Sequence, residues 1–202
     1  MPYREKTSTR MTVRDLVTTA VFTVVYLLVI VSISLTLGMI PVVYPFIIAI
    51  GSVPCGIVWA FLRVKVPKRY CILMQCGIQA IVMFLIGSGW FIASGVLAGA
   101  VAAELVSAFG GYRSFKAAVV AYAAYALCFH AGSFAIVMLA RDYYLEYCVS
   151  SGMDPAYMET LLGFMSWEVF GVSSLLAVIG AVVGMLLGRL FLHKHFLKAG
   201  VV

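Results

Sequence analysis

A single histidine, His130, stands in an otherwise apolar segment, "AYALCFHAGSFAIVML", which runs from residue 124 to residue 139. Ser133 follows it by three residues, so a helix would place both polar groups on one face. Imidazole donates and accepts hydrogen bonds and can exchange a proton near neutral pH. Because an unpaired ring in apolar surroundings is costly, we expect His130 to face a polar neighbour, a cavity or a bound ligand.

Gln79 and Glu104 are two further polar residues inside apolar segments. Polar groups at such positions in membrane proteins commonly mark a ligand site or a pathway. In the membrane spans assigned below, Gln79 and Glu168 lie at depths compatible with that of His130, and they are its predicted hydrogen-bond partners. Glu104 lies nearer the opposite face of the membrane. The alternative for His130 is a purely structural role as a packed hydrogen-bonding group.

The sequence carries no recognisable catalytic or metal-binding motif. An intramembrane metalloprotease would show two histidines one helical turn apart with a glutamate, and an ATPase would show a Gly-rich loop followed by Lys-Ser/Thr. Five cysteines are present without metal-site spacing: Cys55, Cys71, Cys76, Cys128 and Cys148. We therefore expect a protein that is not an enzyme and that holds no metal or cofactor.

The composition predicts a polytopic membrane protein. Apolar residues make up 64% of the 202 residues and charged residues only 11%, with a mean hydropathy of +1.08. One soluble core of this size could not bury so much apolar surface. We expect one all-α domain over residues 1–202, with six spans at Leu16–Leu37, Tyr44–Leu62, Tyr70–Ile86, Phe91–Phe109, Ala117–Ala140 and Trp167–Leu192.

The longest connection, residues 141–166, is too polar to span a membrane. Within it, "DPAYMETLLGFM" predicts a short surface helix, with Asp154 as its cap and Pro155 in its first turn. This helix is expected on the outer side, between the fifth and sixth spans.

The distribution of basic residues predicts the orientation. Thirteen of the fourteen Lys and Arg residues fall at the termini or in connections that share one side of the membrane, and Arg141 is the exception. Basic residues concentrate on the cytoplasmic side, so both termini are expected inside the cell, with the protein in the plasma membrane. The charge of +6 thus reflects topology, and nucleic acid is not an expected partner.

Stripes of small residues indicate close helix packing. Gly180, Gly184 and Gly188 recur every four residues, and Gly95 and Gly99 do the same in the fourth span. These stripes either pack within the chain or dock another membrane subunit. Thr19, Ala20 and Thr23 form a different, slightly polar seam in the first span; the two threonines either bond the preceding turn or help to contact a partner helix.

Aromatic and acidic residues gather at the outer ends of the spans. Tyr44, Trp90, Trp167 and Glu168 are candidate ligand contacts together with His130, Ser133 and Gln79. The alternative is ordinary: tyrosine and tryptophan anchor many spans at the membrane surface, and Glu168 would be a solvated helix end.

Three segments carry a resemblance to a known family: "MTVRDLVTTAVF", "AAELVSAFGGYRSFK" and above all "GMLLGRLFLHKHFLKAGVV". With six spans and no ATPase motif, the whole chain resembles the substrate-binding (S) component of an energy-coupling factor (ECF) transporter, closest to the group called MptD-like or Trep_Strep. These motifs are features of the framework and define no ligand.

The resemblance implies a six-helix bundle that holds a vitamin-like or other small molecule near its outer face. It also implies a transmembrane coupling subunit and two cytoplasmic ATPases as partners. Members of this class contact that subunit through an Ala-x-x-x-Ala motif in the first span; here the corresponding residues are Thr19 and Thr23, or Ala20 followed by Val24. The competing hypotheses are a small intramembrane enzyme that uses His130 or Glu104 and a membrane assembly subunit without a ligand.

Overall fold

The first long helix begins at a capping box that the local sequence encodes. The backbone N–H of Thr12 donates to Asp15 Oδ2 at 2.7 Å, and the N–H of Asp15 donates to Thr12 Oγ1 at 3.3 Å. Asp15 also pairs with Lys68 Nζ at 2.6 Å, which ties the start of this helix to the connection between the second and third long helices.

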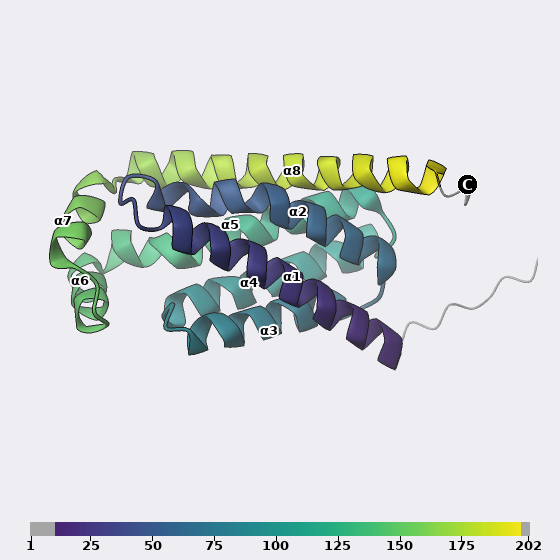
Figure 1. Cartoon of the computed structure of the whole chain (residues 1–202), viewed down its shortest axis with the longest axis horizontal. Helices are drawn as coiled ribbons and strands as arrows, with labels where there is room; N and C mark the ends of the chain where they lie inside the picture. Colours follow the sequence, from purple (N-terminus) through teal and green to yellow (C-terminus); the bar gives the residue numbers. More distant parts are fainter. Residues whose placement is uncertain (1–10, 199–202) are drawn as a thin grey trace, which may run out of the picture.

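The computed structural model describes residues 11–198, and these contain helices and no strands (Figure 1). In chain order they are α1 (Val13–Leu37), the 3-10 turn η1 (Tyr44–Phe46), α2 (Ile47–Lys65), α3 (Cys71–Leu85), α4 (Trp90–Gly110), α5 (Phe115–Leu139), α6 (Arg141–Ser150), α7 (Pro155–Phe164) and α8 (Trp167–Lys198).

Within the described residues, five helical segments are long and apolar enough to cross a membrane: Val13–Leu37, Tyr44–Lys65, Trp90–Gly110, Phe115–Leu139 and Trp167–Lys194. The predicted all-helical, multi-pass architecture is therefore confirmed. The third predicted span corresponds to α3, which is apolar but has only 15 residues, fewer than the roughly 20 that a span ordinarily needs.

The connection after α5 contains two short helices where the sequence predicted one. The predicted helix is α7: Asp154 Oδ1 accepts a hydrogen bond from the N–H of Ala156 at 3.0 Å, and Pro155 occupies the first turn. The unpredicted helix is α6, which has no side-chain cap and follows α5 after a single break at Ala140. Without a capping residue or a proline, its start carries no sequence signal.

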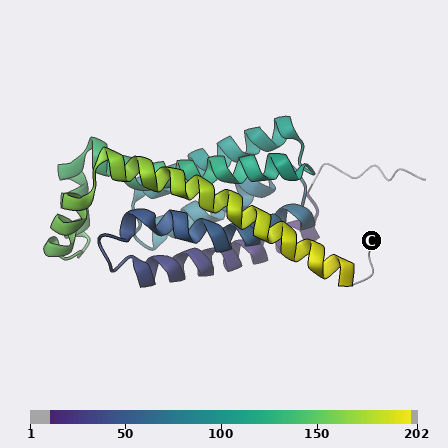
Figure 2. The same ribbon diagram turned by 90° about the horizontal axis from the view of Figure 1, so that it is seen from above.

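The two ends of the bundle differ in architecture and charge. Helices α6 and α7 lie across one end, which we call the capped end; α1 begins and α8 ends at the opposite, basic end (Figures 1 and 2). Basic residues gather at the basic end: Arg14, Arg63, Lys65, Lys68, Arg69, Arg113, Lys116, Arg189 and Lys194. Arg4, Lys6 and Arg10, which the orientation prediction also used, lie outside the described residues.

The predicted small-residue stripes pack helices against one another within the chain. The most extensive contacts join α8 to α2 and α5 to α4. A β-carbon at Gly184 would collide with the carbonyl oxygen of Val53 and lie 2.7 Å from that of Ser52, both on α2. On α4, a β-carbon at Gly95 would lie 2.6 Å from Cα of Gly132. Of the two alternatives, intramolecular packing accounts for these glycines.

A buried aromatic cluster fills the middle of the bundle. Trp59 lies 4.5 Å from Tyr122 and 5.6 Å from Tyr125 between ring centroids. Their polar atoms are paired: the Trp59 indole N–H donates to Gln75, and the Tyr125 hydroxyl donates to Gln79 Oε1 at 2.7 Å. Buried polar groups of this kind fix the relative rotation of the helices that carry them.

Candidate functional site

A cavity of about 310 Å³ lies at the capped end, among α1, η1, α2, α3, α4, α5 and α6. Its volume is at the lower end of the range of about 300–1,000 Å³ that is typical of small-molecule sites. Six aromatic side chains form much of its wall: Tyr44, Phe91, Phe129, Phe134, Tyr144 and Tyr147.

The cavity wall is polar in places but carries no ionisable side chain of Asp, Glu, His, Lys or Arg among the described lining residues. Burial raises the pKa of Tyr144 well above its ordinary value, and burial also raises the pKa of Cys148. Both groups therefore remain uncharged at neutral pH. The polar side chains of the wall are mainly hydroxyl-bearing, namely those of Ser34, Tyr44, Ser88, Ser133, Tyr144, Tyr147 and Ser151.

Two of the serine hydroxyls are already satisfied by their own helices. Ser133 Oγ donates to the carbonyl oxygen of Phe129 at 2.8 Å, and Ser151 Oγ donates to that of Tyr147 at 2.8 Å. Each can still accept one hydrogen bond from a ligand. The wall thus suits a molecule that is held mainly by contact with rings and oriented by a few hydrogen bonds.

Helix α6 is attached to the start of α4 through aromatic contacts. The ring of Phe91 meets those of Tyr144 and Tyr147 edge to face, at centroid distances of 5.6 and 5.5 Å. On the outer side, Trp90 Nε1 donates to the Tyr143 hydroxyl at 3.1 Å. These contacts position the α6 tyrosines over the cavity.

Helix α7 is attached to the other side of the cavity. The Tyr157 hydroxyl donates to the carbonyl oxygen of Gly38 at 2.5 Å, and its ring lies edge-on to Tyr44 at 6.5 Å. Tyr44 in turn meets Phe134 at 5.4 Å. The rings of η1, α5 and α7 are therefore in continuous contact: Tyr44 and Phe134 line the cavity, and Tyr157 packs against Tyr44 from outside it.

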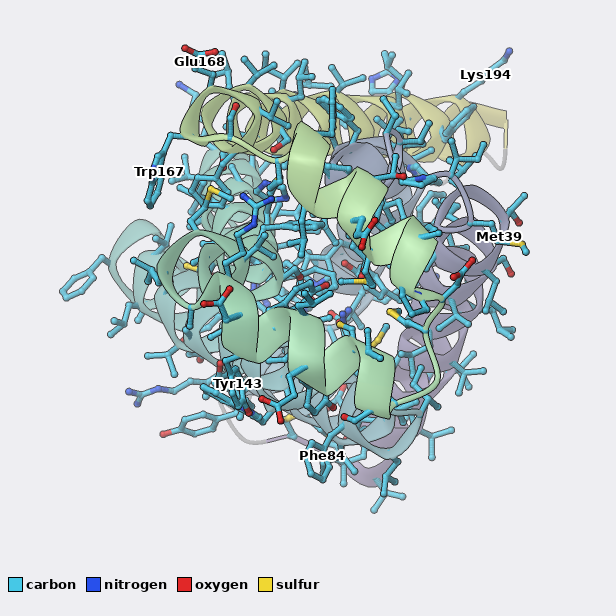
Figure 3. The ribbon with its side chains drawn as sticks, turned by 90° about the vertical axis from the view of Figure 1, so that its left-hand side faces the viewer. Met39, Phe84, Tyr143, Trp167, Glu168 and Lys194 are labelled. Carbon is cyan, nitrogen blue, oxygen red and sulfur yellow. The ribbon has the colours of Figure 1, made fainter. Side chains whose placement is uncertain are left out.

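Only two of the predicted ligand contacts, Tyr44 and Ser133, line this cavity. Trp90 is 50% exposed and Trp167 is 62% exposed. Trp167 and the exposed Glu168 lie at the rim of the capped end and point away from its centre (Figure 3). The structure does not bring these three residues together with Tyr44 and Ser133.

His130 is fully buried between α5 and α8, outside the cavity wall. Its Nε2 lies 2.9 Å from Ser173 Oγ, and its ring stacks on Phe170 at 5.5 Å. The predicted pairing with Gln79 and Glu168 is wrong, because depth along a span does not determine the direction in which a side chain points. Gln79 bonds to Tyr125 in the aromatic cluster instead.

We expect His130→Ala to lower the stability of the unliganded protein by about 2–3 kcal/mol, because it removes a buried ring and its hydrogen bond to Ser173. The Ser173 hydroxyl would keep only its bond to the carbonyl oxygen of Phe170 at 3.1 Å. The affinity for a ligand in the cavity should stay within about twofold of wild type, since His130 is not among the residues that line the cavity. Melting curves and binding measured on the same variant in detergent test this. A large loss of affinity with unchanged melting would place His130 in the site.

Most of the cavity-lining residues were not predicted from the sequence. Tyr144 and Tyr147 are three residues apart, and together with Cys148 they lie on one side of α6. This helical spacing was the signal from which a shared face could have been predicted. Phe91, Phe129 and Phe134 are ordinary span residues in the sequence, and nothing distinguishes them from lipid-facing ones.

The residues of the seam predicted on the first span do not share one environment, because α1 turns some of them inward and others outward. Thr19 and Thr23 are fully buried, and Thr19 Oγ1 lies 3.4 Å from Cys71 Sγ on α3. Their hydroxyls also donate to carbonyl oxygens one turn back, Thr19 to Asp15 and Thr23 to Thr19. Ala20 is exposed beside this buried face, so a partner helix could reach only this member of the seam.

Glu104 belongs to a separate polar group near the basic end. Its Oε1 accepts hydrogen bonds from the Tyr70 N–H at 3.0 Å and the Tyr112 hydroxyl at 2.7 Å. Burial and the hydrogen bond to Glu104 raise the pKa of Tyr112 to about 12, so this hydroxyl remains a donor. Glu104 and His130 thus lie in different groups of contacts and do not form one catalytic pair.

The matching family model is described as "Hypothetical bacterial integral membrane protein (Trep_Strep)", and it covers residues 13–198. Comparisons with curated proteins and with solved structures gave no match. The match extends from the first residue of α1 to the last residue of α8. The chain therefore belongs to the Trep_Strep family of bacterial integral membrane proteins.

Proposed function

We propose that this chain is the substrate-binding subunit of an ECF-type importer, which captures a small molecule at the capped end. The observation that carries the proposal is the aromatic cavity between the helices, at the end of the bundle across which α6 and α7 lie (Figure 3). A cavity at one end of a helical bundle is a common ligand site. A transport role also agrees with membership of an integral membrane family.

In this proposal α3 completes a set of six membrane helices, and the capped end faces the outside. The charge distribution supports this orientation, because basic residues gather at the opposite end. Acidic residues lie at the capped end: Asp142, Glu146, Asp154 and Glu159 in or beside α6 and α7, and Glu168 in the first turn of α8. Both termini would then be cytoplasmic, in the plasma membrane.

The chemistry of the cavity wall favours an uncharged, partly aromatic substrate of vitamin size. A charged ligand would have to leave water without a counter-charge among the lining residues. Stacking and edge-to-face contacts with the tyrosine and phenylalanine rings suit a flat molecule, and hydroxyls of Tyr44 and Tyr144 can orient it.

The partners in this proposal are a transmembrane coupling subunit and two cytoplasmic ATPases. The chain has no phosphate-binding loop motif of its own, so ATP hydrolysis would occur on other subunits. The face of α1 around Ala20, with Val17, Val21 and Val24 exposed beside it, is the proposed contact for the coupling subunit.

The experiment is purification of the full chain from its native host in mild detergent, with mass spectrometry of small molecules released on denaturation. We expect one uncharged compound in near-stoichiometric amount. Proteoliposomes should then take up this compound only when the coupling subunit, the ATPases and ATP are all present. Uptake without ATPases would contradict the ECF assignment, and a chain that never retains a ligand would favour an assembly subunit.

Orientation has an independent test by cysteine labelling of intact cells. A cysteine at Glu159, exposed on α7, should react with a membrane-impermeant maleimide, whereas one at Lys65, exposed at the end of α2, should react only after lysis. The unmodified chain is the control for its own cysteines, of which Cys55, Cys71, Cys76 and Cys148 are buried. The opposite labelling pattern would reverse the proposed orientation.

A further inference from the structure

A second cavity, of about 450 Å³, lies at the basic end. Its wall is formed by the last turns of α2, the connection between α4 and α5, the first turn of α5 and the side of α8. It shares no lining residue with the cavity at the capped end. Its ligand chemistry is therefore a separate question from that of the transported substrate.

Arg63 is the central polar residue of this wall. It is only 4% exposed, yet among the described residues just one of its nitrogens is paired: Nη2 donates to the carbonyl oxygen of Tyr112 at 3.0 Å. Nε and Nη1 are buried and have no hydrogen-bond partner among the described residues. A buried guanidinium with two unmatched donors is costly unless an anion or another acceptor meets them.

Glu104 supplies a carboxylate that acts on Arg63, but the two side chains form no ion pair within 4 Å. Glu104 Oε1 is instead engaged by Tyr70 and Tyr112. The contact between Arg63 and Tyr112 is also made through the ring, which lies 5.6 Å from the guanidinium carbon. Glu104 Oε2 is buried without a partner as well, so neither side chain satisfies the other, and Nε and Nη1 of Arg63 stay unmatched among the described residues.

Other positive features surround the same cavity. Arg113 is part of its wall, and Arg189 lies over the ring of the lining residue Phe115 at 4.9 Å. Ser114 caps α5, and no acidic residue occupies the first turn of this 25-residue helix. The positive end of the α5 dipole therefore faces this region without a compensating carboxylate.

We infer that this cavity binds a phosphate group, and that its source is the headgroup of an anionic phospholipid. Nε and a terminal nitrogen of arginine form a planar fork that matches two oxygens of a phosphate. The cavity lies at the level where the membrane helices end, next to the headgroups of the basic side, where basic pockets between helices attract anionic lipids. Its volume exceeds that of a phosphate alone and leaves room for the attached glycerol.

The test uses the full chain in non-ionic detergent with two probes. Dioleoylphosphatidylglycerol is titrated and its Kd is measured by native mass spectrometry, with dioleoylphosphatidylcholine as the zwitterionic comparison. Separately, melting is measured in potassium phosphate and in potassium chloride at equal ionic strength. The variants are Arg63→Gln and the matched control Lys65→Gln, which removes the same charge from an exposed position two residues away.

We expect phosphatidylglycerol to bind more tightly than phosphatidylcholine, and Arg63→Gln to raise its Kd about tenfold or more. Lys65→Gln should change the Kd by less than about twofold, as for an exposed charge outside the site. Arg113→Gln, at an exposed position of the wall, should weaken binding severalfold and serves as the second variant if Arg63→Gln does not fold.

The other outcomes are equally decisive. Stabilisation of the wild type by inorganic phosphate but not by the lipid, lost in Arg63→Gln, supports the phosphate site with a free anion as its source. Equal effects of Arg63→Gln and Lys65→Gln on the Kd would show that binding depends on general surface charge, and would overturn the inference. Insensitivity of the wild type to both probes would overturn it as well, and would favour a direct ion pair between Arg63 and Glu104.

Discussion

Replacing Gly132 with alanine is expected to destabilise the protein by about 3 kcal/mol, the upper end of the usual cost of overpacking. A β-carbon there would collide with Cα of Gly95 and lie 2.8 Å from the Gly95 nitrogen and 3.0 Å from the Phe91 carbonyl oxygen. All three are backbone atoms of α4, so no side-chain rotation can relieve the contact. The helices α4 and α5 would have to separate.

The measurement is the melting temperature in detergent, which should fall by roughly 5–10 °C. Gly77→Ala on α3 is the matched control, since a β-carbon there meets nothing within 4 Å. This control should be neutral or gain about 0.5–1 kcal/mol, because alanine loses less backbone entropy in a helix. A Gly132→Ala protein that melts like wild type would show that α4 and α5 do not approach so closely.

Replacing Ser133 with leucine is expected to reduce ligand retention about 100-fold or more. Ser133 is 6% exposed and lines the cavity at the capped end. The added branched side chain would occupy part of a volume of only about 310 Å³. Because the added side chain would extend into the cavity and not into a packed helix contact, the melting temperature without ligand should hold or rise.

Ser133→Ala is the control for this change. It removes the hydroxyl, which bonds within its own helix, but leaves the cavity volume intact, so retention should stay within a few-fold of wild type. Both variants are compared by the amount of small molecule that co-purifies with the chain, measured by mass spectrometry. Undiminished retention in Ser133→Leu would locate the ligand elsewhere.

The helices were largely predictable because the apolar spans and their polar connections alternate so clearly. The positions of α1, α2, α4, α5 and α8 follow from hydropathy alone. Helix α6 was not predictable, since its charged residues resemble a connection and its start carries no cap. Its tyrosines therefore went unnoticed as part of the site.

The candidate site was less predictable because hydropathy gives depth but not rotation about a helix axis. His130 and Ser133 share a helix and a depth, yet only Ser133 lines the cavity. In the same way Thr19 and Thr23 turn inward while Ala20 turns outward. In the sequence, Arg63 is one of the basic residues that indicate orientation, and its burial depends on how α2 packs beside the α4–α5 connection.

The shortness of α3 has a consequence for the surrounding bilayer. At 1.5 Å per residue, its 15 residues span about 22 Å, against a hydrocarbon core of about 30 Å. The 32 residues of α8 span about 48 Å by the same rise, and this helix runs obliquely across the bundle (Figure 2). If α3 and α8 both cross the bilayer, the length of α8 is sufficient to span the hydrocarbon core, whereas the length of α3 is not. The bilayer beside α3 would have to become thinner. Because this deformation would occur on one side of the bundle only, the protein would have a preferred direction of tilt.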